Sequence, residues 1–254
     1  MTRIQKSTLT IALVASLLAA TGVTAFVLLD PPRTWDSAPT YIVDQNGSDS
    51  ITDSDGGVSE TVDAIEANVA WNGAGSGTVI HAQAGDTSGI TLGDGIPMLR
   101  FDDPFKVCTG NCLAATFTGY YEERDDGTHR IFDADIVTNP RHEFTTESEP
   151  DGCSSEFFME GIQVHETGHG LGLGHTDVDG ATMFPSVSSC DNGPATIEQD
   201  DADGINALYS GDGGGGDDGG GGGCDLGQKD DACEVDADCC SNKCRGPSGR
   251  KTCK

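Results

Sequence analysis

The spacing of apolar positions along the chain predicts strands first and helices later. Short apolar runs bounded by turn residues predict five strands, at residues 41–44, 78–82, 98–101, 113–121 and 130–138. Apolar residues at helical spacing predict three helices, at residues 61–71, 157–170 and 197–209, with Ser154 or Ser155 as the N-cap of the second. Strands followed by helices that pack on one sheet give an α+β fold. Trp71, at the end of the first predicted helix, is expected to pack in the core.

Composition divides the 254 residues into five parts. Residues 1–25 have the features of a secretory signal peptide, since a short basic region precedes an uncharged apolar run and a small-residue cleavage site. An extended segment at 26–40 leads into a domain at 41–210. Residues 211–223 are almost entirely Gly and Asp, which predicts a flexible linker. Residues 224–254 contain six cysteines and form a separate module, which depends on cross-links because so short a chain cannot build a sufficient core.

The net charge and the cysteine content indicate in which compartment the protein acts and which classes of binding partner are not expected. The formal net charge is −28, from 42 acidic and 14 basic residues, which argues against nucleic acid or an anionic membrane surface as a partner. Ten cysteines in a chain with export features predict disulfides and a secreted, extracellular protein. An uncleaved membrane anchor is the alternative, because the uncharged apolar stretch continues to Leu29 and is long enough to span a bilayer.

The candidate chemistry lies between His165 and His175, in the pattern H-E-x-x-H-x-x-G-x-x-H. His165 and His169 are four residues apart, so on a helix they lie on one face at the spacing of two zinc ligands. His175 is the third predicted ligand, and it reaches the same ion only if the chain turns sharply at Gly172. Glu166 is the predicted general base for a zinc-activated water. We therefore expect a secreted zinc endopeptidase that acts on a protein or peptide substrate.

The residues after this motif resemble the matrixins, a family of metzincin metalloproteases. Residues 176–185 resemble the family's Met-turn, with Met183 as the apolar floor under the histidines, and residues 198–209 resemble its last helix. The resemblance implies a twisted, mostly parallel five-stranded sheet with three helices. It also implies that substrate pairs with the strand formed by Leu113, Ala114, Ala115 and Thr116. One substrate side chain would then enter a pocket walled by Phe184, Pro185, Ser186 and Val187.

The same resemblance also indicates which metal ions the domain is expected to bind. One catalytic Zn²⁺ is expected, and the family's structural Ca²⁺ would be held through Asp133 or Asp135. Many animal matrixins have a histidine for a second, structural zinc where this chain has Ile131, so that second zinc is not expected. No cysteine-switch propeptide segment precedes the domain, and control of that kind is not expected either.

Disulfides are expected in both parts of the chain. Cys153 and Cys190 flank the predicted active-site helix and the Met-turn, so a bond between them would tie the two together, and Cys108–Cys112 would then close a small local loop. The last six cysteines are spaced as in inhibitor cystine knots (knottins), and this resemblance favours the pairs Cys224–Cys240, Cys233–Cys244 and Cys239–Cys253.

Two other functions stay open at this point. One is a catalytically silent metzincin fold that serves as a binding or adhesion protein, and the other is a carrier for a toxin-like or inhibitory knottin. The C-terminal module has two interpretations as well, a protease-resistant tail or a module that binds a surface or substrate. The chain is expected to act as a monomer.

Overall fold

The structure, a computed structural model, describes residues 26–51, 58–75, 79–146 and 153–209, with two short strands near the C-terminus. The predicted signal peptide and linker lie outside the described residues, as do the three predicted knottin disulfides. Of the six-cysteine module the structure describes one antiparallel pair, β9 (Cys244–Arg245) with β10 (Thr252–Cys253). Among the described residues, no helix combines the length and the apolar character needed to cross a membrane.

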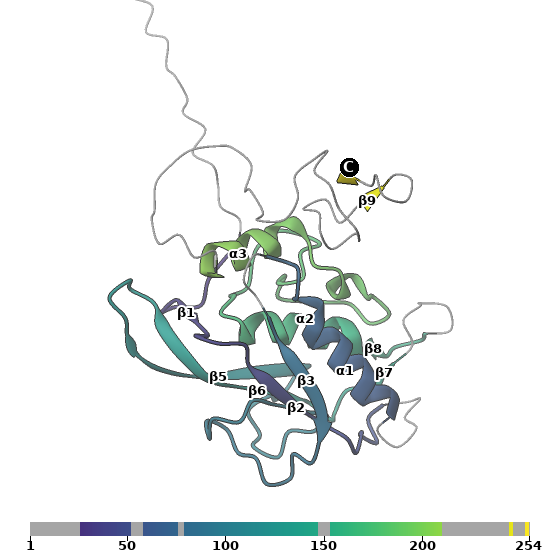
Figure 1. The fold of residues 1–254 in the computed structure, drawn as a ribbon. Helices are drawn as coiled ribbons and strands as arrows, with labels where there is room; N and C mark the ends of the chain where they lie inside the picture. The colour runs from purple at the N-terminus through teal and green to yellow at the C-terminus, as the bar shows by residue number, and fades with distance from the viewer. Residues whose placement is uncertain are drawn as a thin grey trace, which may run out of the picture.

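A mixed sheet of six strands forms one layer of the domain (Figure 1). Its strands are β1 (Arg33–Thr34), β2 (Thr40–Asp44), β3 (His81–Gly85), β4 (Met98–Arg100), β5 (Ala114–Glu123) and β6 (His129–Thr138). The order β3-β2-β4-β6 is parallel, β1 also runs parallel to β6, and β5 pairs with β6 antiparallel. All five predicted strands are present, and β3 begins at His81, three residues later than expected. The additional strand, β1, lies in the segment predicted to be extended.

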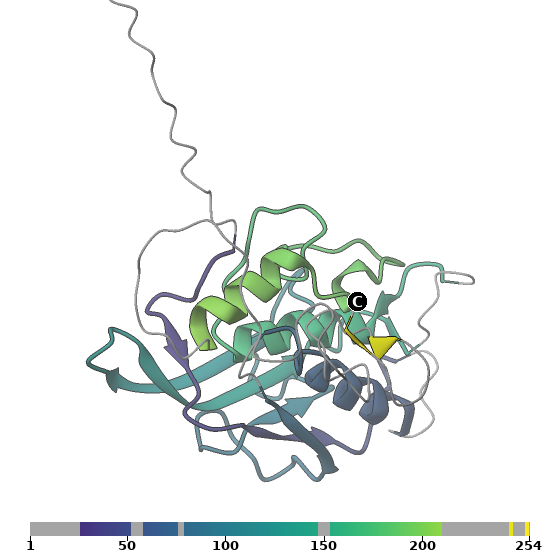
Figure 2. The same cartoon turned by 45° about the horizontal axis from the view of Figure 1, so that its top comes forward.

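The described residues contain three α-helices, as the sequence predicted: α1 (Val58–Ala70), α2 (Met159–Gly170) and α3 (Gln199–Tyr209). Both views show α1 and α2 on one face of the sheet, with α3 next to α2 (Figures 1 and 2). A single 3₁₀ turn at Gly193–Ala195 packs against α2.

The start of α2 differs from the prediction. Two residues that were predicted to be helical, Phe157–Phe158, instead form β8, which pairs with β7 (Phe144–Thr145). Neither Ser154 nor Ser155 caps the helix: Phe158 occupies the N-cap position, and both serine backbone N–H groups donate to the Glu156 carboxylate. The local strand pairing therefore overrides the serine capping signal.

The core lies between the helices and the sheet. Its largest fully buried side chains include Trp71, Tyr41, Phe101, Leu99 and Ile136. The Trp71 indole N–H donates to the carbonyl oxygen of Val164 at 2.9 Å, which joins α1 to α2. Trp71 thus packs in the core, as the sequence predicted, and it supports the helix that carries the histidine motif.

Candidate active site

Three histidine rings converge at the end of α2. Nε2 of His175 lies 3.2 Å from Nε2 of His165 and 3.1 Å from Nε2 of His169. Three ligands at a tetrahedral zinc ion, each about 2.0–2.1 Å from the metal, would be about 3.3 Å apart. Neutral imidazole lone pairs that face one another this closely repel unless they share a cation. The donor set therefore fits one zinc ion.

The backbone sets the tautomer of two of these rings. Nδ1 of His165 donates to the carbonyl oxygen of Thr182 at 2.6 Å, and Nδ1 of His169 donates to that of Leu173 at 2.8 Å. Each Nδ1–H bond leaves the lone pair of Nε2 free to bind metal. Burial lowers the pKa of His165 to about 4 and also lowers the pKa of His169, so both rings are neutral, as ligands must be.

The turn that brings in His175 is a Schellman motif. Gly172 has a φ of +105°, its N–H donates to the carbonyl of His169, and the N–H of Leu173 donates to that of Gly168. A β-carbon at Gly172 would lie 2.3 Å from the backbone oxygen of Arg33, so glycine is required here for space as well as for φ. The sequence predicted this turn from Gly172.

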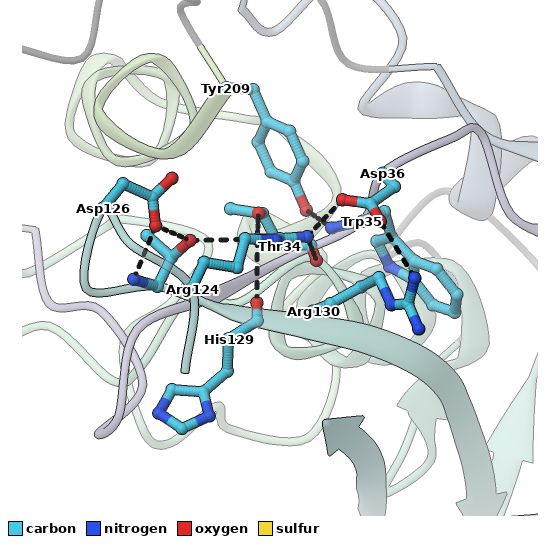
Figure 3. A network of polar contacts seen from close by, with 9 residues as sticks. Thr34, Trp35, Asp36, Arg124, Asp126, His129, Arg130 and Tyr209 are labelled. Atoms are coloured by element: carbon cyan, nitrogen blue, oxygen red, sulfur yellow. Dashed lines mark hydrogen bonds and ion pairs between the residues drawn. The ribbon is translucent and has the colours of Figure 1, made fainter. Parts of the chain in front are cut away.

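The N-terminal segment and α3 hold this turn from outside. Leu29 donates its N–H to the carbonyl of Gly172, and the Trp35 indole N–H donates to that of Gly170, both at 2.9 Å. The Tyr209 hydroxyl donates to the carbonyl of Leu171 at 2.8 Å. Figure 3 shows Tyr209 pointing from α3 toward the backbone N–H of Trp35, beside Arg124 and its contacts to Thr34 and Asp36. Segments from both ends of the domain thus fix the backbone before His175.

Glu166 is buried beneath the histidines, with 6% of its surface exposed. Burial raises the pKa of its carboxyl group, while the electrostatic interaction with the His169 ring and a hydrogen bond from Thr116 oppose that rise. The Thr116 hydroxyl lies 2.6 Å from Oε2 of Glu166 and 2.8 Å from the Glu166 carbonyl oxygen. A buried carboxylate beside the histidine cluster is placed to accept a proton.

Met183 packs under the helix that carries the histidines. It is 2% exposed, and a β-carbon at Gly168 would lie 2.3 Å from its sulfur, so only glycine lets the two approach this closely. Asp201, on α3, holds the backbone of this turn: it accepts from the N–H of Met183 at 3.0 Å and from that of Thr182 at 2.9 Å. Since Thr182 in turn accepts from His165, Asp201 is linked through one residue to a predicted metal ligand.

A cavity of about 590 Å³ opens beside His165, Glu166 and His175. Four of the residues assigned to substrate binding from the sequence, Leu113, Ala114, Phe184 and Pro185, line it, and Ala115 does not. Phe157, Ile162, Val187 and Pro194 add apolar walls. Among the described strands β5 pairs only with β6, which leaves its outer edge free beside this cavity.

Two disulfides are present in the described residues, Cys108–Cys112 and Cys153–Cys190. They are the two pairs named from the sequence for this domain. The first closes the loop that leads into β5, and the second joins the segment before α2 to the segment after the Met-turn.

Asp133 and Asp135 are fully buried on β6. Gly95 donates a backbone N–H to one oxygen of Asp133, and Gly93 donates one to Asp135. The Oδ1 atom of each carboxylate has no hydrogen-bond partner within the described part of the chain. Burial raises the pKa of Asp135 to about 7. Two buried carboxylate oxygens without partners are suitable ligands for a hard cation such as Ca²⁺.

Comparison with known proteins agrees with this geometry. A family model described as Matrixin matches residues 96–210. Metalloendoproteinase 1 of Glycine max is 45% identical over 109 residues, which are 43% of this chain and 30% of that protein. Metalloendoproteinase 5-MMP of Arabidopsis thaliana is 48% identical over 53 residues, which are 21% of this chain and 14% of that protein. Human neutrophil collagenase is 35% identical over 66 residues, which are 26% and 14% of the two chains.

The chain contains a matrixin-like metalloprotease domain. The aligned segments span between 14% and 30% of the length of these relatives. The matched residues carry the histidine motif, the Met-turn, β5, β6, α2 and α3, whereas β1 to β3 and α1 precede the match. The six-stranded sheet nevertheless contains strands from the matched residues and from the residues that precede them.

Sequence reasoning missed three groups of supporting residues. Thr116 was visible only as part of the substrate strand, and the acidic start of α3 gave no sign that Asp201 turns inward. Trp35 and Tyr209 are separated by 174 positions and had no shared signal.

Proposed function

We propose that this protein is a secreted zinc-dependent endopeptidase. The observation that supports it most directly is the convergence of three histidine rings, with Nε2 of His175 within 3.2 Å of Nε2 of both His165 and His169, next to a buried carboxylate. His165, His169 and His175 would hold the zinc. When bound, the metal supplies Lewis-acid activation of water and of the scissile carbonyl.

The protein's own residues supply the remaining steps. Glu166 accepts a proton from the attacking water and passes it to the leaving amine. A peptide substrate adds as a strand to the free edge of β5, where Leu113 and Ala114 border the cavity. One substrate side chain enters the apolar pocket beyond Phe184 and Pro185. Apolar walls favour an apolar side chain at that position.

Several finer assignments belong to the same proposal. Calcium would bind beside Asp133 and Asp135, where buried oxygens lack partners. Residues 1–25 would direct secretion, and residues 211–223 would link the domain to a knottin-like module that binds a surface or substrate. A catalytically silent binding protein is the weaker alternative, because Glu166 and all three histidines are present.

The test compares the wild-type protein with Glu166→Ala, using casein and a quenched fluorescent peptide. Cleavage by the wild-type protein should stop with a zinc chelator and return with zinc. Glu166→Ala should lose at least about a hundredfold in kcat, the lower range for general-base catalysis, and still bind one zinc ion. Undiminished cleavage by Glu166→Ala would remove the general-base assignment, and absence of chelator-sensitive cleavage by the wild type would remove the proposal.

A further inference from the structure

A single threonine connects the substrate strand to the predicted general base. Thr116 lies in β5, in register with Ile136 of β6, two residues beyond Ala114, which lines the cavity. Its hydroxyl oxygen is 2.6 Å from Oε2 of Glu166 and 2.8 Å from the carbonyl oxygen of the same residue. Both possible acceptors of this hydroxyl proton therefore belong to Glu166.

The geometry favours the carboxylate as acceptor while Glu166 is ionised. A separation of 2.6 Å falls within the range for an O–H donor to a charged oxygen, about 2.5–2.7 Å. A carboxylate has two oxygens that exchange places when the group rotates. The bond from Thr116 fixes Oε2 and so decides which oxygen faces the cavity that Glu166 lines.

The other carboxylate oxygen of Glu166, Oε1, is available to accept a proton. No protein group among the described residues donates to it, and Thr116 alone hydrogen-bonds to the Glu166 side chain. We propose that Thr116 is a positioning residue for Glu166: its hydroxyl holds Oε2 so that Oε1 is directed at the attacking water. This inference rests on the proposed function, because it assigns a role within the same peptidase site.

Because the Thr116 hydroxyl has two acceptors on Glu166, it can donate a hydrogen bond both when the carboxyl group is ionised and when it is protonated. When Oε1 has accepted a proton from water, the carboxyl group is neutral and Oε2 becomes a weaker acceptor. The Thr116 hydroxyl can then turn to the Glu166 carbonyl oxygen at 2.8 Å without any backbone movement. The hydroxyl keeps its own proton throughout, and the proton taken from water leaves Oε1 for the amine.

The strand position adds a link to substrate binding. Thr116 is carried by β5, the strand whose free edge borders the cavity. A peptide that pairs with this edge would restrict the backbone of β5 and with it the Thr116 hydroxyl. Orientation of the base is therefore expected to affect turnover more than substrate affinity.

The experiment compares Thr116→Val, which keeps the shape and removes the hydroxyl, with Thr116→Ser, which keeps the hydroxyl. Thr118→Val is the matched control, since Thr118 is two residues away on β5 and its hydroxyl accepts from Arg33. We expect Thr116→Val to lower kcat at least tenfold on a quenched peptide, with KM within twofold and one zinc bound. Thr116→Ser should recover at least half of the wild-type kcat, and Thr118→Val should stay within twofold of it.

A second readout does not depend on turnover. The infrared carboxylate band of Glu166, assigned by difference from Glu166→Gln at one fixed pH, should move in Thr116→Val and stay in place in Thr116→Ser. If Thr116→Val does not fold, Thr116→Ala takes its place in both measurements.

Three results would overturn the role of Thr116: a Thr116→Val kcat within twofold of wild type, an equal loss in Thr116→Ser, or an equal loss in Thr118→Val. Each of these leaves the peptidase proposal standing when the wild type is active. If the wild type shows no chelator-sensitive cleavage, the proposed function fails instead. An unmoved infrared band in Thr116→Val would then independently show that the hydroxyl does not hold Glu166.

Discussion

The hydroxyl of Tyr209 donates a 2.8 Å hydrogen bond to the carbonyl oxygen of Leu171, which joins the last residue of α3 to the turn after α2. This turn places His175, the predicted ligand that α2 itself cannot supply. The neighbouring carbonyl oxygens also accept hydrogen bonds, that of Gly170 from the Trp35 indole N–H and that of Gly172 from the Leu29 backbone N–H. The position of the third predicted ligand therefore depends on contacts from both ends of the domain.

Tyr209→Phe removes this hydrogen bond, together with the longer one that the hydroxyl accepts from the Trp35 backbone N–H at 3.4 Å, and keeps the ring. We expect the free energy of unfolding to fall by about 1 kcal/mol, the usual net value of such a bond. Zinc affinity should fall by up to about tenfold, the lower range for changes around a metal ligand. Urea unfolding and competition with a fluorescent zinc chelator measure the two effects. Tyr121→Phe, at a half-exposed tyrosine of β5, is the control, and an equal loss of zinc affinity there would contradict the prediction.

Asp201→Asn changes a carboxylate that accepts three backbone N–H groups, from Thr182, Met183 and Glu198. In the variant, the NH₂ group of asparagine replaces one carboxylate oxygen. At least one of the three backbone N–H groups then faces another donor and loses its hydrogen bond. We expect a loss of about 3 kcal/mol in the free energy of unfolding, as for hydrogen bonds to a buried charge. Thermal and urea unfolding measure it.

Asp203→Asn is the matched control, because Asp203 is an exposed residue of the same helix that accepts from Gln199. The free energy of unfolding of Asp203→Asn should stay within about 0.5 kcal/mol of the wild-type value, as for most surface substitutions. Similar losses in the two variants would show that helix charge, not support of the Met-turn, determines the effect.

The two disulfides are expected to differ in their contribution to stability. Cys153–Cys190 closes a loop with a sequence separation of 37, and Cys108–Cys112 one with a separation of 4. In the chain-entropy account the longer loop contributes about 4 kcal/mol and the shorter about 2 kcal/mol. Two double Cys→Ala variants, one for each bond, measure this by urea unfolding under non-reducing conditions. Equal losses would indicate that local native contacts outweigh loop closure.

Asp135 predicts a pH dependence of stability in calcium-free buffer. Burial raises its folded-state pKa from 3.8 to about 7, so the folded protein holds a proton that the unfolded chain has released. Its contribution to stability is fully present below pH 3.8 and is lost as pH rises through about 7. Asp135→Asn removes this ionisation and still accepts from Gly93, so the variant should gain stability relative to wild type between pH 4 and 7.

Calcium should reverse this difference if it binds beside Asp133 and Asp135, because the cation favours the charged carboxylates. Thermal unfolding of wild type and Asp135→Asn at pH 5 and pH 8, each with and without calcium, makes the comparison. A wild-type Tm that calcium does not change at pH 8 would exclude the calcium site. A stability difference that stays constant with pH would exclude the assigned ionisation.

Local sequence determined much of this protein. The 3.6-residue spacing put His165 and His169 on one helix face, and Gly172 marked the turn, because helix periodicity and positive φ are properties of short stretches. Strand alternation identified the strands of the sheet for the same reason. Capping at α2 could not be predicted in this way, since the pairing of β7 with β8 fixed the residues before the helix.

Only the tertiary structure decided which distant groups support the site. Thr116 reaches Glu166 across 50 positions, and Tyr209 reaches Leu171 across 38. Asp201 turns inward because α3 packs against the Met-turn, whereas its neighbour Asp203 faces solvent. The acidic run alone does not distinguish these two carboxylates, since hydrogen bonds between remote segments depend on how whole elements pack. The sequence thus carries the predicted metal ligands and the predicted base, and packing of the strands and helices supplies the contacts that orient them.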